Sequence, residues 1–146
     1  SMEQDLLETG GGAKQALGYL GEAPFIVVSS DILVDFDYQR LLEVDAVNNH
    51  LVLVRNPEHH PQGDFRLTAS GCVRLGSEAT FAGIGVITPD LIRNCPKAAF
   101  PLRDVLFPAA SEGRLTGEMH LGYWSDVGTP ERLAAAQADY ESGLCR

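Results

Sequence analysis

The sequence predicts an α/β sandwich in which helices cover a mostly parallel β-sheet. Residues 24–28 and 50–55 form continuous runs of apolar β-formers, which is the pattern of strands buried on both faces. Helical segments alternate with these runs, because residues 13–20 precede the first run and residues 36–42 lie between the two. Alternation of helices with buried strands is typical of a sheet held between helical layers.

Glycines and prolines divide the N-terminal half of the chain. The first helix, expected over residues 13–20, ends at Gly21, a residue type that suits the conformation following many helices. A loop rich in Pro, His and Gly covers residues 56–64 after the second strand. A β-hairpin is expected over residues 65–75.

The C-terminal half is expected to begin with a long strand at residues 80–88. Pro89 fits the first position of a short helix, where its missing N–H group is no loss. A further helix over residues 102–110 is expected to be interrupted or to end at Pro108. Residues 114–124 fit two short strands or one bent hairpin.

Two aspartates lie where a ligand is expected. Asp31 directly follows the first strand, and Asp126 lies just before a final helix with Thr129 as its N-cap and Pro130 at its first position. Open parallel sheets bind ligands at the carboxyl ends of their strands. Two carboxylates that converge there suit Mg²⁺ and phosphoryl transfer, while the alternative for each is a turn or cap residue.

Three other features carry weaker signals. The Gly-rich segment at residues 9–12 can bring backbone N–H groups close to a nucleotide, although it matches neither a dinucleotide-binding nor a Walker A sequence. His59 and His60 are adjacent in a loop, which favours a solvated pair over a metal site. Trp124 fits either a base-stacking role or a core position.

Length and charge limit the possible partners. The 146 residues favour one domain over residues 3–146, with Ser1 and Met2 interpreted as a tag scar and a start codon. With 20 acidic and 11 basic residues the net charge is −9, which argues against nucleic acid or an anionic membrane as partner. We find no apolar run near the ~20 residues of a membrane span and no signal peptide. Three scattered cysteines indicate a reducing, cytoplasmic compartment.

Taken together, these segments resemble the sugar-1-phosphate nucleotidylyltransferases, also called nucleoside-diphosphate-sugar pyrophosphorylases. The branch that most resembles this sequence is the N-acetylmuramate 1-phosphate uridylyltransferases, which serve peptidoglycan recycling. The segments that carry the resemblance, in order, are residues 7–12, 23–31, 50–57, 63–67, 81–84 and 124–133. The match covers roughly the C-terminal two thirds of such an enzyme.

The resemblance implies a fold, a reaction and a site. The fold is a Rossmann-like sandwich around a mixed, mostly parallel sheet, without the family's N-terminal strands. In the reaction, a sugar 1-phosphate attacks the α-phosphorus of a nucleoside triphosphate and pyrophosphate leaves, with Mg²⁺ bound by Asp31 and Asp126. The implied nucleotide contacts are Glu8, Thr9, Gly10 and Ser30, and the implied sugar contacts are Gly63, Asp64, Phe81 and Gly83.

The sequence departs from the family in two places. Ser29 and Ser30 stand where the family has Asn-Gly, and a side chain at the second position narrows the approach of a substrate. The family's leading strand, Arg-bearing Gly-rich loop and Pro-Lys pair, which cradle the triphosphate, have no counterpart in this sequence. We therefore expect part of an enzyme that is inactive alone.

Two alternatives stay open at this point. The chain fits a non-catalytic sugar- or nucleotide-binding or assembly module, in which an exposed sheet edge favours a homodimer. It also fits an enzyme of the same class with other substrates, either GTP with mannose 1-phosphate or dTTP with glucose 1-phosphate.

Overall fold

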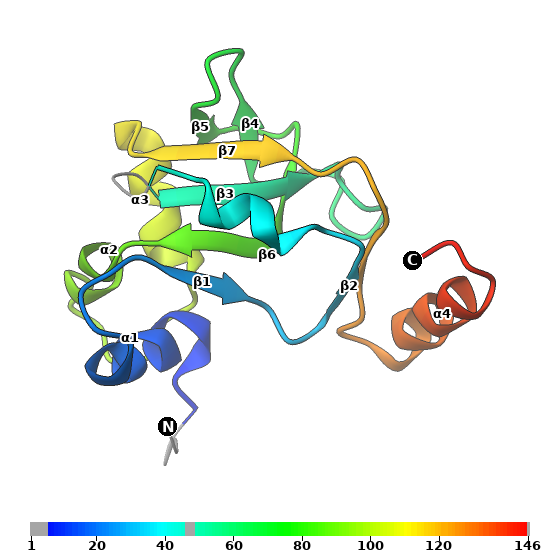
Figure 1. Cartoon of the computed structure of the whole chain (residues 1–146), viewed down its shortest axis with the longest axis horizontal. Helices are drawn as coiled ribbons and strands as arrows, with labels where there is room; N and C mark the ends of the chain where they lie inside the picture. Colours follow the sequence, from blue (N-terminus) through cyan, green and yellow to red (C-terminus); the bar gives the residue numbers. More distant parts are fainter. Residues whose placement is uncertain (1–5, 46–48, 146) are drawn as a thin grey trace.

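A four-stranded sheet forms the centre of the computed structural model, which describes residues 6–45 and 49–145 (Figure 1). Ser1 and Met2, interpreted above as a tag scar and a start codon, lie outside the described residues. The strands follow the order β1 (Phe25–Val28), β6 (Thr80–Ile87), β3 (Asn49–Val54) and β7 (Leu115–Met119). Strand β6 is antiparallel to β1 and β3, and β3 is parallel to β7. Three of the four strands therefore run in one direction, with β6 running against them, and the predicted mixed sheet is confirmed.

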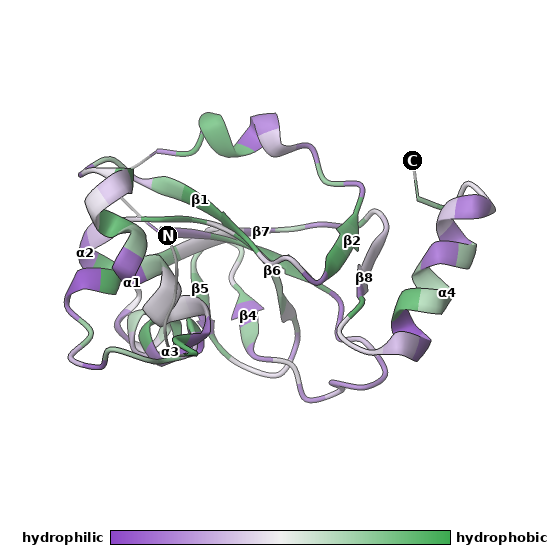
Figure 2. Cartoon of the chain, turned by 90° about the horizontal axis from the view of Figure 1, so that it is seen from below, coloured by the Kyte–Doolittle hydropathy of each residue, from purple (hydrophilic) through white to green (hydrophobic). Residues whose placement is uncertain are grey.

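Helices α1 (Glu8–Leu20), α2 (Pro89–Arg93) and α3 (Arg103–Glu112) lie together on one side of the sheet (Figure 2). Between them and the sheet is the larger apolar core, in which Phe100 and Leu106 are almost fully buried. Helix α1 begins earlier than predicted, because Gly10 and Gly11 both donate backbone hydrogen bonds to Phe100 O. A Cβ at Gly10 would overlap the Phe100 ring, so the glycines let this helix start approach the core.

A smaller apolar cluster lies on the opposite face of the sheet. It includes Phe36, Leu41 and Val52 and is covered by the 3₁₀ helix η1 (Tyr38–Leu42). Asp37 caps this helix by accepting a hydrogen bond from Gln39 N. The predicted helix over residues 36–42 is thus confirmed in a shorter and tighter form.

Two small sheets complete the fold. The hairpin of β4 (Phe65–Leu67) and β5 (Val73–Leu75) is present as predicted. Strand β2 (Ile32–Val34) pairs antiparallel with β8 (Trp124–Asp126), and Ile32 lies opposite Asp126. Helix α4 (Pro130–Glu141) comes after β8, and Val127 N in the connecting segment donates a hydrogen bond to Asp31 O in the turn after β1.

Two local predictions are wrong, and one pair of alternatives is resolved. Strand β1 is not buried on both faces, because it is the edge strand and its Ile26 and Val28 side chains are 38% and 45% exposed. Pro108 neither interrupts nor ends α3, since the helix continues to Glu112. Of the two alternatives for residues 114–124, the two short strands are present as β7 and β8, and the bent hairpin is not formed because β7 pairs with β3 and β8 pairs with β2.

Two further predictions from the sequence concern membrane-spanning segments and the state of the cysteines. Among the described helices, none has the length and apolar character needed to cross a bilayer. The three cysteines are all free thiols, and burial raises the pKa of Cys145.

Candidate functional site

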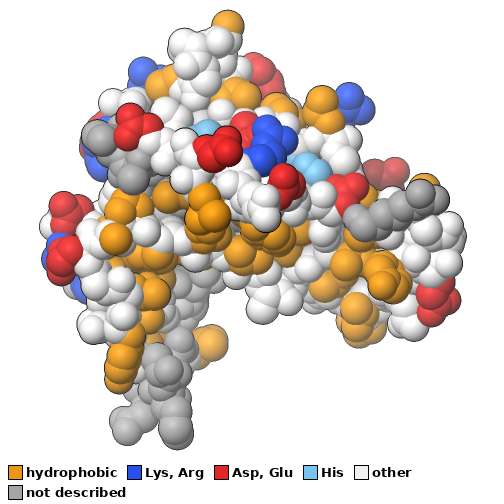
Figure 3. All heavy atoms as spheres, viewed as in Figure 1, with side chains coloured by type: hydrophobic (Ala, Val, Ile, Leu, Met, Phe, Trp, Pro, Cys, Tyr) orange, Lys and Arg blue, Asp and Glu red, His pale blue; other side chains and the backbone are white. Residues whose placement is uncertain are grey.

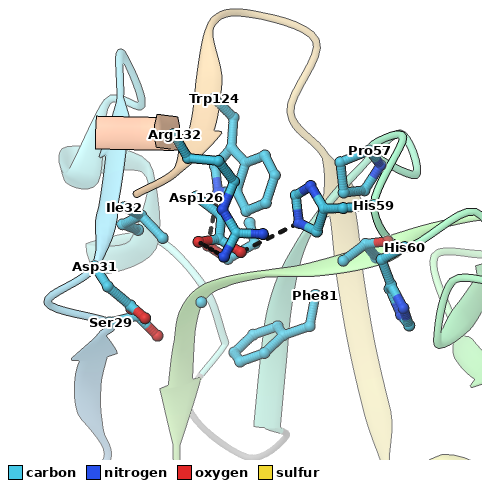
Figure 4. Close-up of a pocket in the computed structure, with 13 residues that line it drawn as sticks. Ser29, Asp31, Ile32, Pro57, His59, His60, Phe81, Trp124, Asp126 and Arg132 are labelled. Atoms are coloured by element: carbon cyan, nitrogen blue, oxygen red, sulfur yellow. Dashed lines mark hydrogen bonds and ion pairs between the residues drawn. The ribbon is translucent and has the colours of Figure 1, made fainter. Parts of the chain in front are cut away.

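A pocket of about 440 Å³ opens between the end of β1, the start of β6 and the β2–β8 pair (Figure 4). Its walls combine two carboxylates, two histidines, one arginine and aromatic or small apolar groups. The lining residues are Ser29, Asp31, Ile32, Pro57, His59, His60, Thr80, Phe81, Ala82, Gly83, Trp124, Asp126 and Arg132. Its volume falls in the range of small-molecule sites.

Asp126 ends strand β8 with both carboxylate oxygens engaged. Oδ1 accepts a hydrogen bond of 2.7 Å from Gly128 N, which is an Asx turn before helix α4. His59 Nε2 lies 3.2 Å from Oδ2, and an Arg132 guanidinium nitrogen lies 3.4 Å from Oδ1 (Figure 4). The carboxylate is therefore fixed by one backbone donor and flanked by two side chains that carry or can carry positive charge.

Asp31 occupies the turn between β1 and β2, beside Asp126. Its backbone oxygen accepts a hydrogen bond of 2.8 Å from Val127 N, which ties the turn to the segment after β8. A Cβ added to Gly128 would lie 3.0 Å from Asp126 Oδ1 and 3.7 Å from Asp31 Oδ2. Both carboxylates thus border one small space, and Gly128 keeps that space open.

The back wall of the pocket comes from β6. Trp124 Nε1 donates a 2.9 Å hydrogen bond to Ala82 O, which fixes the indole against this strand. Gly83 has φ +80°, and its oxygen accepts a 2.8 Å hydrogen bond from Ser29 N. A Cβ at Gly83 would lie 2.6 Å from Ser29 Oγ, so the glycine allows β6 to approach the end of β1.

A side wall is supported by Asp64. Its Oδ1 lies 3.1 Å from His60 Nε2, and its Oδ2 accepts a 3.1 Å hydrogen bond from Phe81 N. Gly63 adopts φ +58° with its backbone against the Asn56 side chain. His60 and Phe81 therefore line the pocket, while Gly63 and Asp64 lie outside the set of lining residues and hold them in place.

The expected nucleotide contacts lie outside this lining. Glu8, Thr9 and Gly10 form the first turn of α1, where Gly10 packs on Phe100, and Ser30 lies in the turn next to Asp31. Of the expected sugar contacts, Phe81 and Gly83 do line the pocket. The binding roles of all these residues stay predictions.

Sequence reasoning missed two residues of the site. His59 was interpreted as half of a solvated pair, yet it lies against Asp126. Arg132 carried no signal by its residue type, although its place in the first turn after the Thr129 cap puts it near any ligand at the start of that helix. At the same helix start, the pKa of Glu131 is lowered, because its carboxylate is hydrogen-bonded by the backbone N–H of Glu131 itself and by the side chain of Thr129.

The donor set suits a hard divalent cation that shares its ligands with a substrate. Mg²⁺ is commonly held by one or two protein carboxylates together with phosphate oxygens and water. The pocket lining contains two carboxylates, those of Asp31 and Asp126. Among the described residues, no cluster of three or more His, Cys, Asp or Glu side chains could by itself hold a metal ion.

Curated proteins resemble nearly the whole chain. It is 39% identical over 142 residues to the N-acetylmuramate alpha-1-phosphate uridylyltransferase of Neisseria meningitidis, covering 90% of this chain and 62% of that protein. The enzyme of the same name from Caulobacter vibrioides is 32% identical over 149 residues, covering 90% of this chain and 61% of that protein. A mannose-1-phosphate guanyltransferase of Aspergillus fumigatus is 28% identical, covering 100% of this chain and 44% of that protein.

Solved structures resemble the fold at lower identity. HddC from Yersinia pseudotuberculosis complexed with GMP-PN has a TM-score of 0.76 and 22% identity, covering 96% of this chain and 65% of that one. A putative glucose-1-phosphate thymidylyltransferase from Bacillus anthracis has a TM-score of 0.79 and 15% identity, covering 94% and 63%. No protein-family model matches the chain. The predicted resemblance is thus confirmed: the chain is related to the sugar-1-phosphate nucleotidyltransferases and spans about 60% of the first curated relatives it matches.

Proposed function

We propose that the chain supplies the metal- and sugar-phosphate-binding part of a nucleotidyltransferase that makes a nucleoside-diphosphate sugar and pyrophosphate. The observation that carries this proposal is that Asp31 and Asp126, from opposite halves of the chain, border one pocket. Two carboxylates around a small polar space suit a cation that neutralises phosphate charge. Little covalent chemistry is then required of the protein, since such transfers depend on positioning and charge stabilisation.

Each wall of the pocket has a task in this reaction. Asp31 and Asp126 would hold Mg²⁺, which supplies charge neutralisation for the phosphate oxygens when bound. Trp124 and Phe81 offer apolar faces to a ring, with Gly83, Gly63 and Asp64 behind or beside them at the sugar end. Glu8, Thr9, Gly10 and Ser30 are the proposed nucleotide contacts.

The proposed substrates are UTP and N-acetylmuramate 1-phosphate. The support is that two curated relatives, which are 39% and 32% identical to the chain, carry the corresponding name. This choice would place the activity in peptidoglycan recycling and in the cytoplasm. GTP with mannose 1-phosphate is the alternative supported by the Aspergillus relative, and dTTP with glucose 1-phosphate is the third.

Substrate choice and activity are tested by pyrophosphate release with these three substrate pairs. We expect slow or no turnover by the 146 residues alone, because Arg132 is the one Lys or Arg among the described pocket residues and a triphosphate requires more positive charge. We expect UTP to bind in the presence of Mg²⁺, measured through the fluorescence of Trp124, the single tryptophan of the chain. Rapid turnover by the chain alone would disprove the inactivity proposal.

The metal ligands are tested separately. Asp31→Asn and Asp126→Asn should each weaken Mg²⁺-dependent UTP binding by at least about tenfold, which corresponds to about 1.4 kcal/mol. Asp90→Asn is the matched control, because this exposed aspartate pairs with Arg93 on α2, away from the pocket. Equal UTP binding by all three variants and the wild type would remove Asp31 and Asp126 from the site.

A second candidate function is a non-catalytic binding or assembly module. It is favoured by the β1 edge, where Ile26 and Val28 are exposed, and by hydrophobic side chains along the lower side of the molecule in Figure 3. A second copy of the chain that added its own strand to β1 would cover this edge. Light scattering over a range of concentrations tests the homodimer, and a monomer at every concentration would exclude it.

A further inference from the structure

Arg132 faces the pocket with hydrogen-bonding capacity that the described protein groups leave unused. Among the described lining residues it is the one Lys or Arg. Its guanidinium lies 3.4 Å from Asp126 Oδ1, which is an ion pair longer than a good hydrogen bond. Its Nε is buried and has no hydrogen-bond partner. The side chain as a whole is 32% exposed, so the acceptor oxygens of a ligand in the pocket can reach its terminal N–H groups.

The shape and charge of the group indicate which ligand. A guanidinium is always charged and presents its N–H groups as a planar fork that matches the oxygens of a phosphate. Without a cation, the two aspartates outweigh Arg132, so the pocket repels phosphate. A divalent cation on Asp31 and Asp126 reverses this balance, and Arg132 then adds to the attraction.

In this geometry, Arg132 and a bound cation would share one partner. The cation and the guanidinium both need Asp126, whose Oδ1 already accepts a hydrogen bond from Gly128 N. We infer that Arg132 is a phosphate-binding residue of this pocket and that it competes with a divalent cation for Asp126. With Asp126 bound to the cation, Arg132 is released to bind a phosphate group of the nucleotide or of the sugar phosphate. This inference rests on the proposed function, which supplies the phosphate ligand.

A purely structural role makes the opposite prediction. If Arg132 only fixes the Asp126 carboxylate, its removal weakens cation and phosphate binding together. If it competes for Asp126 and binds phosphate, its removal strengthens cation binding and weakens phosphate binding. The signs of the two effects therefore separate the roles.

The experiment compares wild type with Arg132→Gln, Arg132→Lys and Arg66→Gln. Arg66 is an exposed arginine on β4 that does not line the pocket, so its variant controls for the loss of one positive charge. Mn²⁺ binding is measured from the free-ion signal in electron paramagnetic resonance. Pyrophosphate and glucose 1-phosphate are titrated with Mg²⁺ present, and pocket occupancy is read from Trp124 fluorescence.

We expect Arg132→Gln to bind Mn²⁺ about threefold tighter and at least one phosphate probe about tenfold weaker. Arg132→Lys should keep the Mn²⁺ affinity of the wild type and lose part of the phosphate affinity, because an ammonium lacks the fork. Arg66→Gln should match the wild type. Weaker pyrophosphate binding by Arg132→Gln assigns Arg132 to the nucleotide phosphates. Weaker binding of glucose 1-phosphate assigns it to the sugar phosphate.

Two outcomes overturn the inference. One is a parallel loss of Mn²⁺ and phosphate binding, and the other is phosphate binding equal to that of the wild type in Arg132→Gln. If UTP, pyrophosphate and glucose 1-phosphate all bind to Arg132→Gln as to the wild type, the inference fails and the proposed function stands. If pyrophosphate binds through Arg132 but UTP and every sugar 1-phosphate fail to bind, the phosphate site stands and the proposed function fails.

Discussion

The two ends of the central sheet are held together in different ways. At one end, α1, α2 and α3 pack on the sheet through apolar side chains such as Phe100 and Leu106, which are almost fully buried. At the other end, β2, β8 and α4 surround the pocket, and Ala136 is the one buried residue of α4 among those described. Hydrogen bonds from Trp124 and Gly128 fix this second end.

The helical end is therefore expected to determine stability, and the pocket end is expected to determine ligand binding. Burial of apolar area is the main source of folding free energy, so the helical end should set the stability of the molecule. The pocket end contributes few buried apolar groups and carries the titratable and charged groups. Substitutions at the first end should unfold the chain without altering the site, and those at the second end should alter ligand binding at little cost in stability.

The largest effect on stability is expected from a substitution in the apolar core at the helical end. Phe100→Ala removes a side chain that is 1% exposed, and we expect a loss of about 3–5 kcal/mol in the free energy of unfolding because a cavity remains. Chemical denaturation measures this loss. Leu121→Ala is the control, since Leu121 is 75% exposed and its removal should change stability by less than about 0.5 kcal/mol. Mn²⁺ binding per folded molecule should be the same in both variants, and a change in Phe100→Ala would show that the two ends are coupled.

An intermediate effect is expected at Gly83, a residue that affects both the stability of the fold and ligand binding in the pocket. Gly83→Ala forces an L-residue to φ +80° and crowds Ser29, so we expect a loss of about 1–3 kcal/mol and weaker ligand binding. Gly71→Ala is the matched control, because it imposes φ +77° with no neighbour within 4 Å of the added Cβ. Denaturation and Trp124 fluorescence should show strain in both variants but loss of binding in Gly83→Ala alone. Equal binding by the two variants would contradict a close approach of β6 to β1 at the pocket.

The smallest effect concerns pH and lies under η1, on the face opposite the helices. Burial lowers the pKa of His50, whose Nδ1 lies 2.9 Å from Thr116 Oγ1, while Glu118 and Arg40 face it from β7 and η1. Because the unfolded state takes up the proton first, this histidine should reduce stability as pH falls below about 6.5, and its contribution is intact above that pH.

His50→Gln is the test of that pH dependence. Glutamine keeps a hydrogen-bonding group for Thr116 and cannot titrate, so the loss of stability on acidification should be smaller than in the wild type. Denaturation curves between pH 5 and 8 measure the difference. Identical pH dependence in the two proteins would show that His50 is not the group responsible.

Patterns that depend on local sequence were predicted well. The Thr129 cap, Pro130 at the first helical position and Pro89 at the start of α2 all lie as expected, because capping and proline geometry act within one turn. The apolar run of β3 is buried as predicted. Asp31 and Asp126 both line the pocket, while their binding of a metal ion stays a prediction.

Features that depend on which elements become neighbours were not predictable in this way. The run in β1 is as apolar as that in β3, and only its edge position leaves Ile26 and Val28 exposed. His59 comes to lie beside Asp126 through pairing of β2 with β8, which no local pattern near His59 indicates. The same is true of Arg132, whose role depends on the direction in which α4 leaves β8.

The pairing of β2 with β8 has a consequence for the order in which a growing polypeptide acquires its parts. All four strands of the central sheet have been synthesised once Met119 has been added, whereas β8 and its Asp126 come later. A chain that stopped between these points would hold the sheet and Asp31 without the second carboxylate. Ribosome-bound intermediates should therefore gain native sheet structure before they gain affinity for a divalent cation.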